Sequence, residues 1–310
     1  MWNDHEAVAD GSTARVLVNL LALAVFLVLA VPAVRHAPLV TLSVRPETTV
    51  REGHGTSDGE SDLARRREHL IGVYGGMPYT QSSDVHVTRP DGSQFDMKGV
   101  NWDGKPFQEP IYYGVRILSW GREGRLGGMI DFTHAKAIHQ TSQEVALQGT
   151  KDGTALPPKA AVGTLFKRLE FSHGHNMLTL NGLYRLPIGT ATVRPYVGIG
   201  AGIALPHTEI WVEGDPRRTY EYQYAGPVVQ ALIGAEIRLP RSLSLFIEYK
   251  FDYSWYDVPL TGDEGSWLGL DLSRQMKRWL NGEAAPNGRL STDLATHQLI
   301  GGVLYSSRGR

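Results

Sequence analysis

The stretch LSLFIEYKFDYSWY, residues 243–256, decides the fold of this chain. Its odd positions are apolar or aromatic, and its even positions are polar or charged except for Phe246. An alternation of period two is typical of a β-strand, whose successive side chains point to opposite faces. The second face carries Glu248, Lys250 and Asp252, charges that an ordinary core would not accept unpaired. The pattern therefore predicts the wall of a transmembrane β-barrel, apolar toward lipid and charged toward its lumen.

The composition agrees with a membrane barrel. The chain has 310 residues, a formal net charge of −1 and no cysteine. A charge so close to zero does not favour nucleic acid as a partner, and the lack of thiols excludes thiol catalysis and suits an oxidising periplasm. The 35 glycines and 13 tyrosines suit curved strands and interfacial aromatic girdles.

The N-terminal region contains one long apolar run, residues 16–34. Small residues at the minus-three and minus-one places predict cleavage after Ala33, so residues 1–33 are interpreted as a signal peptide. Acidic residues close to the N-terminus leave an uncleaved anchor open as the alternative. Residues 34–68 are polar and unpatterned and are predicted to be a disordered periplasmic linker. The remainder, residues 69–310, is predicted to be an outer-membrane barrel.

Eight runs with strand character predict an all-β fold, an eight-stranded antiparallel transmembrane β-barrel with long outer loops. Short turns follow the second, fourth and sixth runs, and longer connections follow the others. Because outer-membrane barrels have short periplasmic turns and long outer loops, both termini are expected in the periplasm. Eight strands enclose a lumen that side chains fill, so a pore is not expected. The runs are 70–77, 111–120, 126–137, 175–186, 193–206, 224–239, 243–256 and 294–305.

Charged residues on the inward face are expected to neutralise one another, because buried charges need partners. Asp131 and Asp252 lie nearer the outer ends of their strands and are better candidates for a function. The inward set is Arg116, Asp131, Arg185, Arg194, Glu236, Arg238, Glu248, Lys250 and Asp252.

Histidine placement is the most informative functional signal. Six of the eleven lie after residue 130, at strand ends that the topology places at the outer rim: His134, His139, His173, His175, His207 and His297. Imidazoles near carboxylates such as Glu209 can bind Zn, Fe, Mn or Cu. In HGHN at 173–176, His173 and His175 are expected on one strand face, about 7 Å apart by strand rise. The alternative is that each histidine is an ordinary polar rim residue.

Cationic side chains near the outer strand ends could hold the phosphates of lipopolysaccharide, because Lys and Arg pair strongly with phosphate. Solvated loop charges are the alternative. The residues are Lys105, Lys136, Arg217 and Arg218.

Six motifs occur in order along the predicted barrel: YYGVR at 112–116, DFTHAK at 131–136, LEFSHGHN at 169–176, PYVGIGAGIALPHTEI at 195–210, YAGPVVQ at 224–230 and LFIEYK at 245–250. Together they resemble the outer-membrane lipid A oxidases of rhizobia and their relatives. The resemblance implies an enzyme whose partner is lipopolysaccharide, and the chain is expected to be a monomer. It would use molecular oxygen to oxidise the proximal glucosamine of lipid A to 2-aminogluconate and release hydrogen peroxide.

These observations predict a site at the outer mouth of the barrel, with a base for the anomeric hydroxyl and a place to activate oxygen. The predicted catalytic residues are Asp131, His134, His175 and Glu248. The predicted substrate contacts are Lys136, Asn176 and Lys250. A divalent metal of unspecified identity is expected on some of His134, His175, His207 and Glu209. The alternatives are a non-enzymatic structural or adhesive barrel and a lipid A deacylase or acyltransferase.

Overall fold

The computed structural model describes residues 67–265 and 267–306. The predicted signal peptide, residues 1–33, and all but the last two residues of the predicted linker, 34–68, lie outside the described residues. None of the helices described is both long enough and apolar enough to cross a bilayer.

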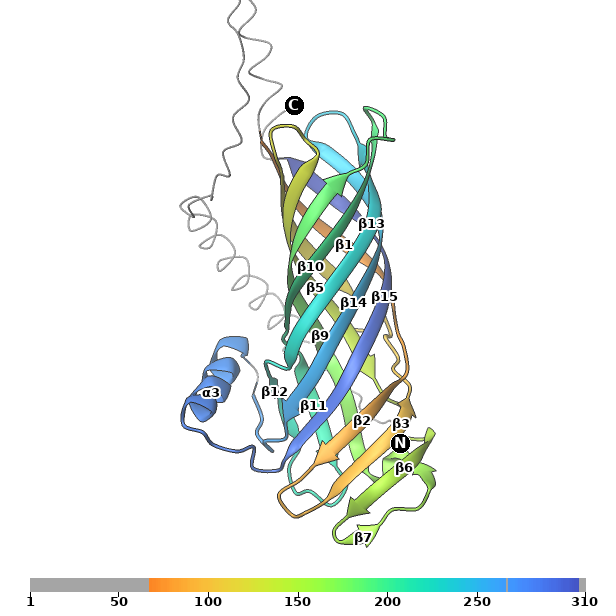
Figure 1. Ribbon diagram of the computed structural model, residues 1–310, viewed down its shortest axis with the longest axis vertical. Helices are drawn as coiled ribbons and strands as arrows, with labels where there is room; N and C mark the ends of the chain where they lie inside the picture. Colours follow the sequence, from red (N-terminus) through yellow and green to blue (C-terminus); the bar gives the residue numbers. More distant parts are fainter. Residues whose placement is uncertain (1–66, 266, 307–310) are drawn as a thin grey trace, which may run out of the picture. The chain divides into compact units, whose positions relative to one another are not determined.

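Eight antiparallel strands close into a barrel, as predicted (Figure 1). The last strand returns to the first, with Val73 opposite Val303, so the barrel has no open edge. We call the end that carries the long connections the outer end; it is the lower end in Figure 1. In order around the wall, the strands are β1 (Glu68–Thr80), β4 (Tyr113–Trp120), β5 (Leu126–Ile138), β9 (Phe166–Arg185), β10 (Val193–Ala204), β13 (Gly226–Arg238), β14 (Leu243–Pro259) and β15 (Arg289–Ser306).

The long connections at the outer end, which were predicted to be loops, contain short strands and helices. Strands β9 and β15 also begin earlier than predicted, so the wall extends beyond the apolar belt and pairs with the added strands. The added elements are β2 (Ser83–Thr88), β3 (Gln94–Val100), β6 (Glu144–Lys151), β7 (Thr154–Ala155), β8 (Lys159–Ala161), η1 (Val162–Thr164), β11 (His207–Val212), β12 (Thr219–Tyr222) and α3 (Leu268–Leu280).

An apolar belt surrounds the half of the barrel nearest the short turns. Large hydrophobic side chains point outward there and remain exposed, among them Ile71, Val73, Leu180, Ile199, Ile233, Leu245, Ile247, Leu299 and Val303. Tyr184 and Tyr305 lie toward one edge of this belt, and Tyr79, Tyr224 and Trp255 lie toward the other. Aromatic side chains at both edges of an apolar band are typical of a barrel that spans a membrane.

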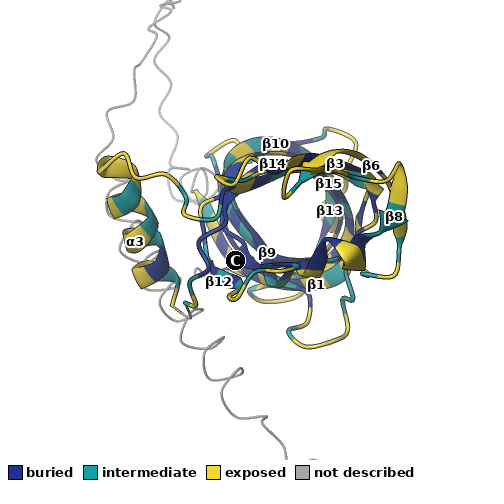
Figure 2. Ribbon diagram, turned by 90° about the horizontal axis from the view of Figure 1, so that it is seen from below, coloured by how far each residue is buried: buried dark blue, intermediate teal, exposed yellow. Residues whose placement is uncertain are grey.

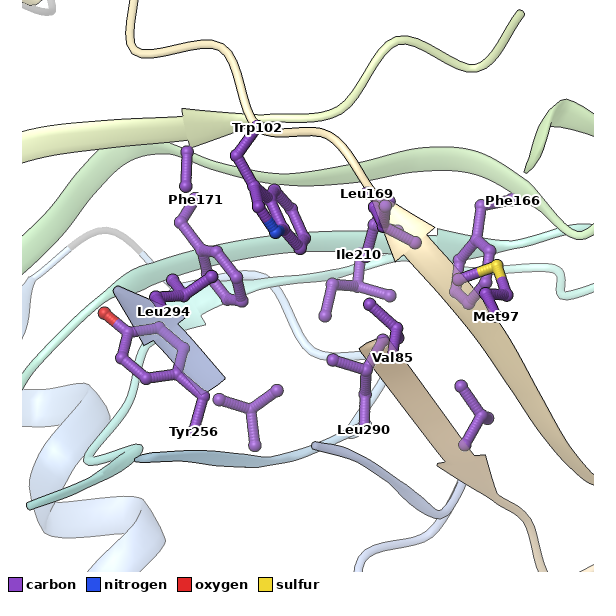
Figure 3. Close-up of a cluster of buried hydrophobic side chains, with 14 of the residues drawn as sticks. Val85, Met97, Trp102, Phe166, Leu169, Phe171, Ile210, Tyr256, Leu290 and Leu294 are labelled. Carbon is purple, nitrogen blue, oxygen red and sulfur yellow. The ribbon is translucent and has the colours of Figure 1, made fainter. Parts of the chain in front are cut away.

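The interior changes character along the barrel axis. Figure 2 shows the barrel from its outer end, with the buried residues of the wall in dark blue. In the membrane half, charged and polar side chains fill the lumen together with a small apolar cluster. Beyond the belt, a continuous apolar core fills the space between β14, β15 and the added strands (Figure 3). Phe166, Phe171, Leu290 and Leu294 are among its fully buried members. We call the first region the lumen network and the second the outer core.

Candidate functional site

Among the described residues, eight of the nine predicted lumen charges have a partner of opposite charge within 4 Å, and Asp252 is the exception. Arg116 donates two hydrogen bonds to Glu248, at 2.9 and 3.0 Å, and a third to Asp131 at 3.1 Å. Lys250 donates to Asp131 at 2.9 Å, and Gln230 donates to the buried Asp252 at 2.6 Å. Arg116, Asp131, Glu248, Lys250 and Asp252 are each 1% exposed or less. A buried charge needs such partners, and Arg116 and Lys250 balance Asp131 and Glu248. Asp252 instead accepts hydrogen bonds from the neutral amides of Gln230 and Gln298.

This pairing corrects the placement of three predicted site residues. Asp131, Glu248 and Lys250 were expected at the rim, as base or as substrate contacts. They lie instead within the part of the lumen that the apolar belt surrounds, opposite Arg116, Ile300 and Gln298 of the neighbouring strands. The barrel wall separates them from any lipid in the outer leaflet.

A bulge in β9 decides where the HGHN histidines point. Ala135 of β5 pairs with His175, whereas Ala137 pairs with Phe171, so a single β5 residue opposes three residues of β9. Gly174 at the bulge has a φ of +140°, a conformation that residues with a side chain rarely adopt. A Cβ at this position would lie 2.3 Å from the amide of Asn176, so the bulge requires glycine.

Because of this bulge, the prediction that His173 and His175 share a strand face is wrong. His175 points inward and is fully buried, with its Nδ1 hydrogen-bonded to the Tyr256 hydroxyl and its Nε2 3.3 Å from the Thr296 hydroxyl. His173 points outward and lies beside His207, with 5.2 Å between the ring centroids. The extra residues in the bulge turn His173 outward, whereas unbroken alternation would place it on the same face as His175.

The outward side of the bulge carries a group of rings, which we call the outer-wall cluster: His134, His173, His207, Tyr113, Tyr220 and Tyr222. His207 packs edge-on against Tyr220 and Tyr222, with centroid distances of 4.4 and 4.6 Å. His134 stacks on Tyr113 at 4.8 Å. The cluster lies just beyond the apolar belt. Phe132 is two residues before His134 on β5, and Ile203 near the end of β10 comes shortly before His207.

Two imidazole nitrogens in the outer-wall cluster lack a partner within the described ranges. The Nδ1 of His134 donates to Oδ1 of Asn176 at 2.8 Å, and Nδ2 of Asn176 donates to the backbone carbonyl of Leu205 at 3.1 Å. The buried Nε2 of His134 and the buried Nδ1 of His207 then have no hydrogen-bond partner in residues 67–265 and 267–306. Unsatisfied buried polar atoms are uncommon in native proteins and often mark a functional position.

Burial keeps the histidines of this cluster neutral near pH 7. Desolvation lowers the pKa of His207 to about 3, and the neighbouring His173 adds to the effect. Desolvation also lowers the pKa of His173, although Glu209 and Glu170 oppose the change. Neutral rings can accept a hydrogen bond or a proton from a hydroxyl group. Of the two, His173 is only partly buried and is therefore the one that a ligand can reach from the surface.

The four predicted metal ligands do not form one site. His175 faces the lumen while His134 and His207 lie on the outer wall, and Glu209 accepts a hydrogen bond from Arg218 at 2.6 Å. Across the part of the chain that the structure describes, no group of three or more His, Asp or Glu side chains is arranged to hold a metal ion.

Cations surround the cluster on its outward side. Lys136, predicted to contact substrate, donates to the backbone carbonyl of Gln108 at 2.8 Å. Beyond it, a surface groove of about 470 Å³ is lined by Lys105, Lys167 and Arg168, with Glu170 as an acidic member. Lys136 is buried, and Arg168 is already paired with Glu170 at 2.8 Å. Lys105 is therefore the cation of this groove best placed to meet an anionic headgroup.

The sequence predicted that all six histidines after residue 130 lie at the outer end, but not which of them face the lumen and which face outward. His134, His173 and His207 share the outer wall, and His175 lies in the lumen. His139 bonds to the backbone of Asn101 beside Trp102. His297 faces outward among Tyr79, Tyr249 and Phe251. Three partners were missed: Tyr113, Tyr220 and Tyr222, of which Tyr220 and Tyr222 lie in a strand shorter than periodicity can detect.

The fold and its belt define an outer-membrane β-barrel protein. No protein-family model matches the sequence, and no curated protein matches it. Among solved structures, the chain is similar to Neisserial surface protein A (NspA), with 10% identity and a TM-score of 0.31 over 77% of this chain and 96% of that one. It is also similar to the outer membrane protease OmpT from Escherichia coli, with 10% identity and a TM-score of 0.36 over the same shares.

Proposed function

We propose that this chain is an outer-membrane enzyme that oxidises lipid A, and that the outer-wall cluster contacts the proximal glucosamine from the lipid-facing side. One observation carries the proposal. Two buried imidazole nitrogens, on His134 and His207, have no partner among the residues that the structure describes, and they lie beside the reachable His173 at the outer edge of the apolar belt. The headgroup of a lipid in the outer leaflet lies at that height, whereas the lumen is closed to it. The motif resemblance supplies the reaction class.

The reaction balances with molecular oxygen as the oxidant. The glucosamine must carry a free anomeric hydroxyl, which loses its proton while the hydrogen on C1 leaves with two electrons. A lactone forms, and oxygen takes up two electrons and two protons to become hydrogen peroxide. Water then opens the lactone to 2-aminogluconate, a net gain of one oxygen atom.

The residues of this chain can bind the sugar and move the hydroxyl proton. His173, neutral near pH 7, accepts that proton, and Tyr220 lies close enough to orient the ring, with its hydroxyl 3.4 Å from Nε2 of His173. Asn176 holds His134 in one orientation through the bond at 2.8 Å. Lys105 in the neighbouring groove pairs with a lipid phosphate.

A second candidate function is a non-enzymatic structural or adhesive barrel. The packing of the outer core favours it, because apolar side chains fill the outer end of the barrel. In that case the histidines would serve only to pack β11 and β12 against the wall.

Mass spectrometry of lipid A from cells that express the chain distinguishes these functions. An oxidase adds one oxygen atom to lipid A with a free anomeric hydroxyl, and His173→Gln removes this gain. The matched control, His175→Gln, changes the neighbouring lumen histidine and retains the gain in correctly assembled protein. Unmodified lipid A with folded wild-type protein would contradict the oxidase and favour the structural barrel. A lost or added acyl chain would instead indicate a deacylase or acyltransferase.

A further inference from the structure

Helix α3 turns its polar side to the barrel. Asp271 accepts a hydrogen bond from the backbone N–H of Tyr222 at 3.1 Å. Gln275 accepts one from the N–H of Tyr224 at 2.7 Å and donates one to its carbonyl at 2.9 Å. Arg278 pairs with Asp263 in the loop that precedes the helix. Contacts of this number fix the helix beside β12, to one side of the wall (Figures 1 and 2).

The apolar side of α3 points away from the barrel. Leu272, Met276, Trp279 and Leu280 follow the spacing of three and four residues that places side chains on one helix face. Met276 is 60%, Trp279 78% and Leu280 81% exposed. A helix on the surface of a water-soluble domain buries such a face, so the orientation here is inverted.

The height of the helix along the barrel shows what covers this face. Its anchor, Tyr224, precedes Ala225, whose N–H bonds to the carbonyl of Ala204 at the last pair of β10. Tyr224 and Trp255 are both partly exposed on the outer edge of the apolar belt. The anchor of α3 therefore lies level with the outer edge of the apolar belt.

We propose that α3 is an interfacial helix that lies in the outer leaflet, with Met276, Trp279 and Leu280 among acyl chains. Helices that bind membrane surfaces carry tryptophan and leucine on one face and cations beside it, which meet anionic headgroups. Helix α3 has this composition, with Lys277 and Arg274 as the cations. Because α3 holds β12 through Tyr222, this docking also fixes the depth at which the outer-wall cluster meets the leaflet.

Site-directed spin labelling tests the docking directly, since the chain has no cysteine of its own. Full-length Met276→Cys and Leu280→Cys variants would carry nitroxides in vesicles of phosphatidylcholine and phosphatidylglycerol. Lys277→Cys is the matched control on the polar flank of the same helix. The barrel in each preparation is verified by its heat-dependent electrophoretic mobility.

Lipid contact predicts a several-fold higher ratio of oxygen to aqueous nickel-complex collisions at positions 276 and 280 than at 277. Equal, high accessibility to the nickel complex at all three positions would place the helix in water and overturn the proposal. Protection from both reagents with spin–spin broadening would also overturn it, because a second copy of the chain would then cover the face. None of these results depends on lipid A oxidation.

Discussion

The two halves of this barrel are filled in opposite ways. In the membrane half, the lumen holds the charges of Arg116, Asp131, Glu248 and Lys250 beside a small apolar cluster, and an apolar belt faces outward. In the outer half, the apolar side chains face inward and form the outer core. The surrounding medium explains the inversion, because lipid accepts the apolar side of a strand and water accepts the polar side.

Strand β14 shows both regimes within one continuous element. Leu245 and Ile247 point outward to the belt, and Glu248 and Lys250 point inward to paired charges. Ten residues beyond Glu248, Val258 points inward to the outer core and is fully buried. A single strand can therefore cross from lipid to water: its outward face is apolar within the belt, and its inward face is apolar beyond it.

Arg116→Ala is the strongest test of the charged half. The substitution leaves Asp131 and Glu248 buried with one cation fewer, which is expected to reduce the free energy of unfolding by about 3–5 kcal/mol. Urea unfolding of the refolded barrel in lipid vesicles measures it. The matched control, Arg289→Ala, removes an exposed pair with Asp257 and should change the stability by less than about 1 kcal/mol. Equal losses in the two variants would contradict the buried network.

Leu290→Ala tests the apolar half. Leu290 is fully buried in the outer core, so the cavity is expected to cost about 3 kcal/mol. The loss of stability should appear first in β2 and β3, because their buried side chains pack in the outer core, whereas the side chains of the apolar belt do not. Limited proteolysis of β2 and β3, compared with urea unfolding of the whole barrel, measures where the loss falls. Unchanged proteolysis in these strands would show that the core does not hold them.

Acidification tests the outer-wall cluster and should have the smallest effect. The pKa of His207 is about 3 in the folded chain and about 6.5 when unfolded, so the unfolded state binds more protons between these values. The contribution of the neutral ring is fully present above about pH 6.5 and decreases as the pH falls. By pH 5 the outer strands should lose roughly 2 kcal/mol.

Hydrogen exchange of the β11 and β12 amides at pH 7.5 and pH 5, corrected for the intrinsic exchange rate, measures this loss. His207→Gln cannot take up the proton and should show a smaller dependence on pH than the wild type. The same pH dependence in wild type and variant would assign the acid sensitivity to other groups.

Much of the barrel could be predicted from alternation alone. The apolar face of residues 243–256 and the short turns identified eight strands, the lumen charges and the outer end. The two-residue strand β7 and the four-residue β12 are too short for periodicity to detect. They form because the extended ends of β6 and β11 offer backbone partners, which depends on tertiary contacts that a local pattern does not contain.

The site was harder to predict than the fold, because the bulge at one glycine changes the direction of a side chain that regular strand alternation would fix. With an unbroken β9, His173 and His175 would face the same way. The bulge at Gly174 sends them to opposite sides of the wall. A glycine between two polar residues in a strand is a known sign of a bulge, so this signal was present in HGHN. Helix α3 also had a signal, since its apolar residues repeat at three and four positions.

The central claim is that the barrel wall separates the histidines of HGHN, with one toward the leaflet and the other in a closed interior. Single-cysteine variants His173→Cys and His175→Cys, treated with a membrane-impermeant maleimide in proteoliposomes, test it in a chain that has no other thiol. We predict rapid labelling at position 173 and protection at position 175 until the barrel is unfolded. Comparable labelling at both positions in the folded protein would contradict the account.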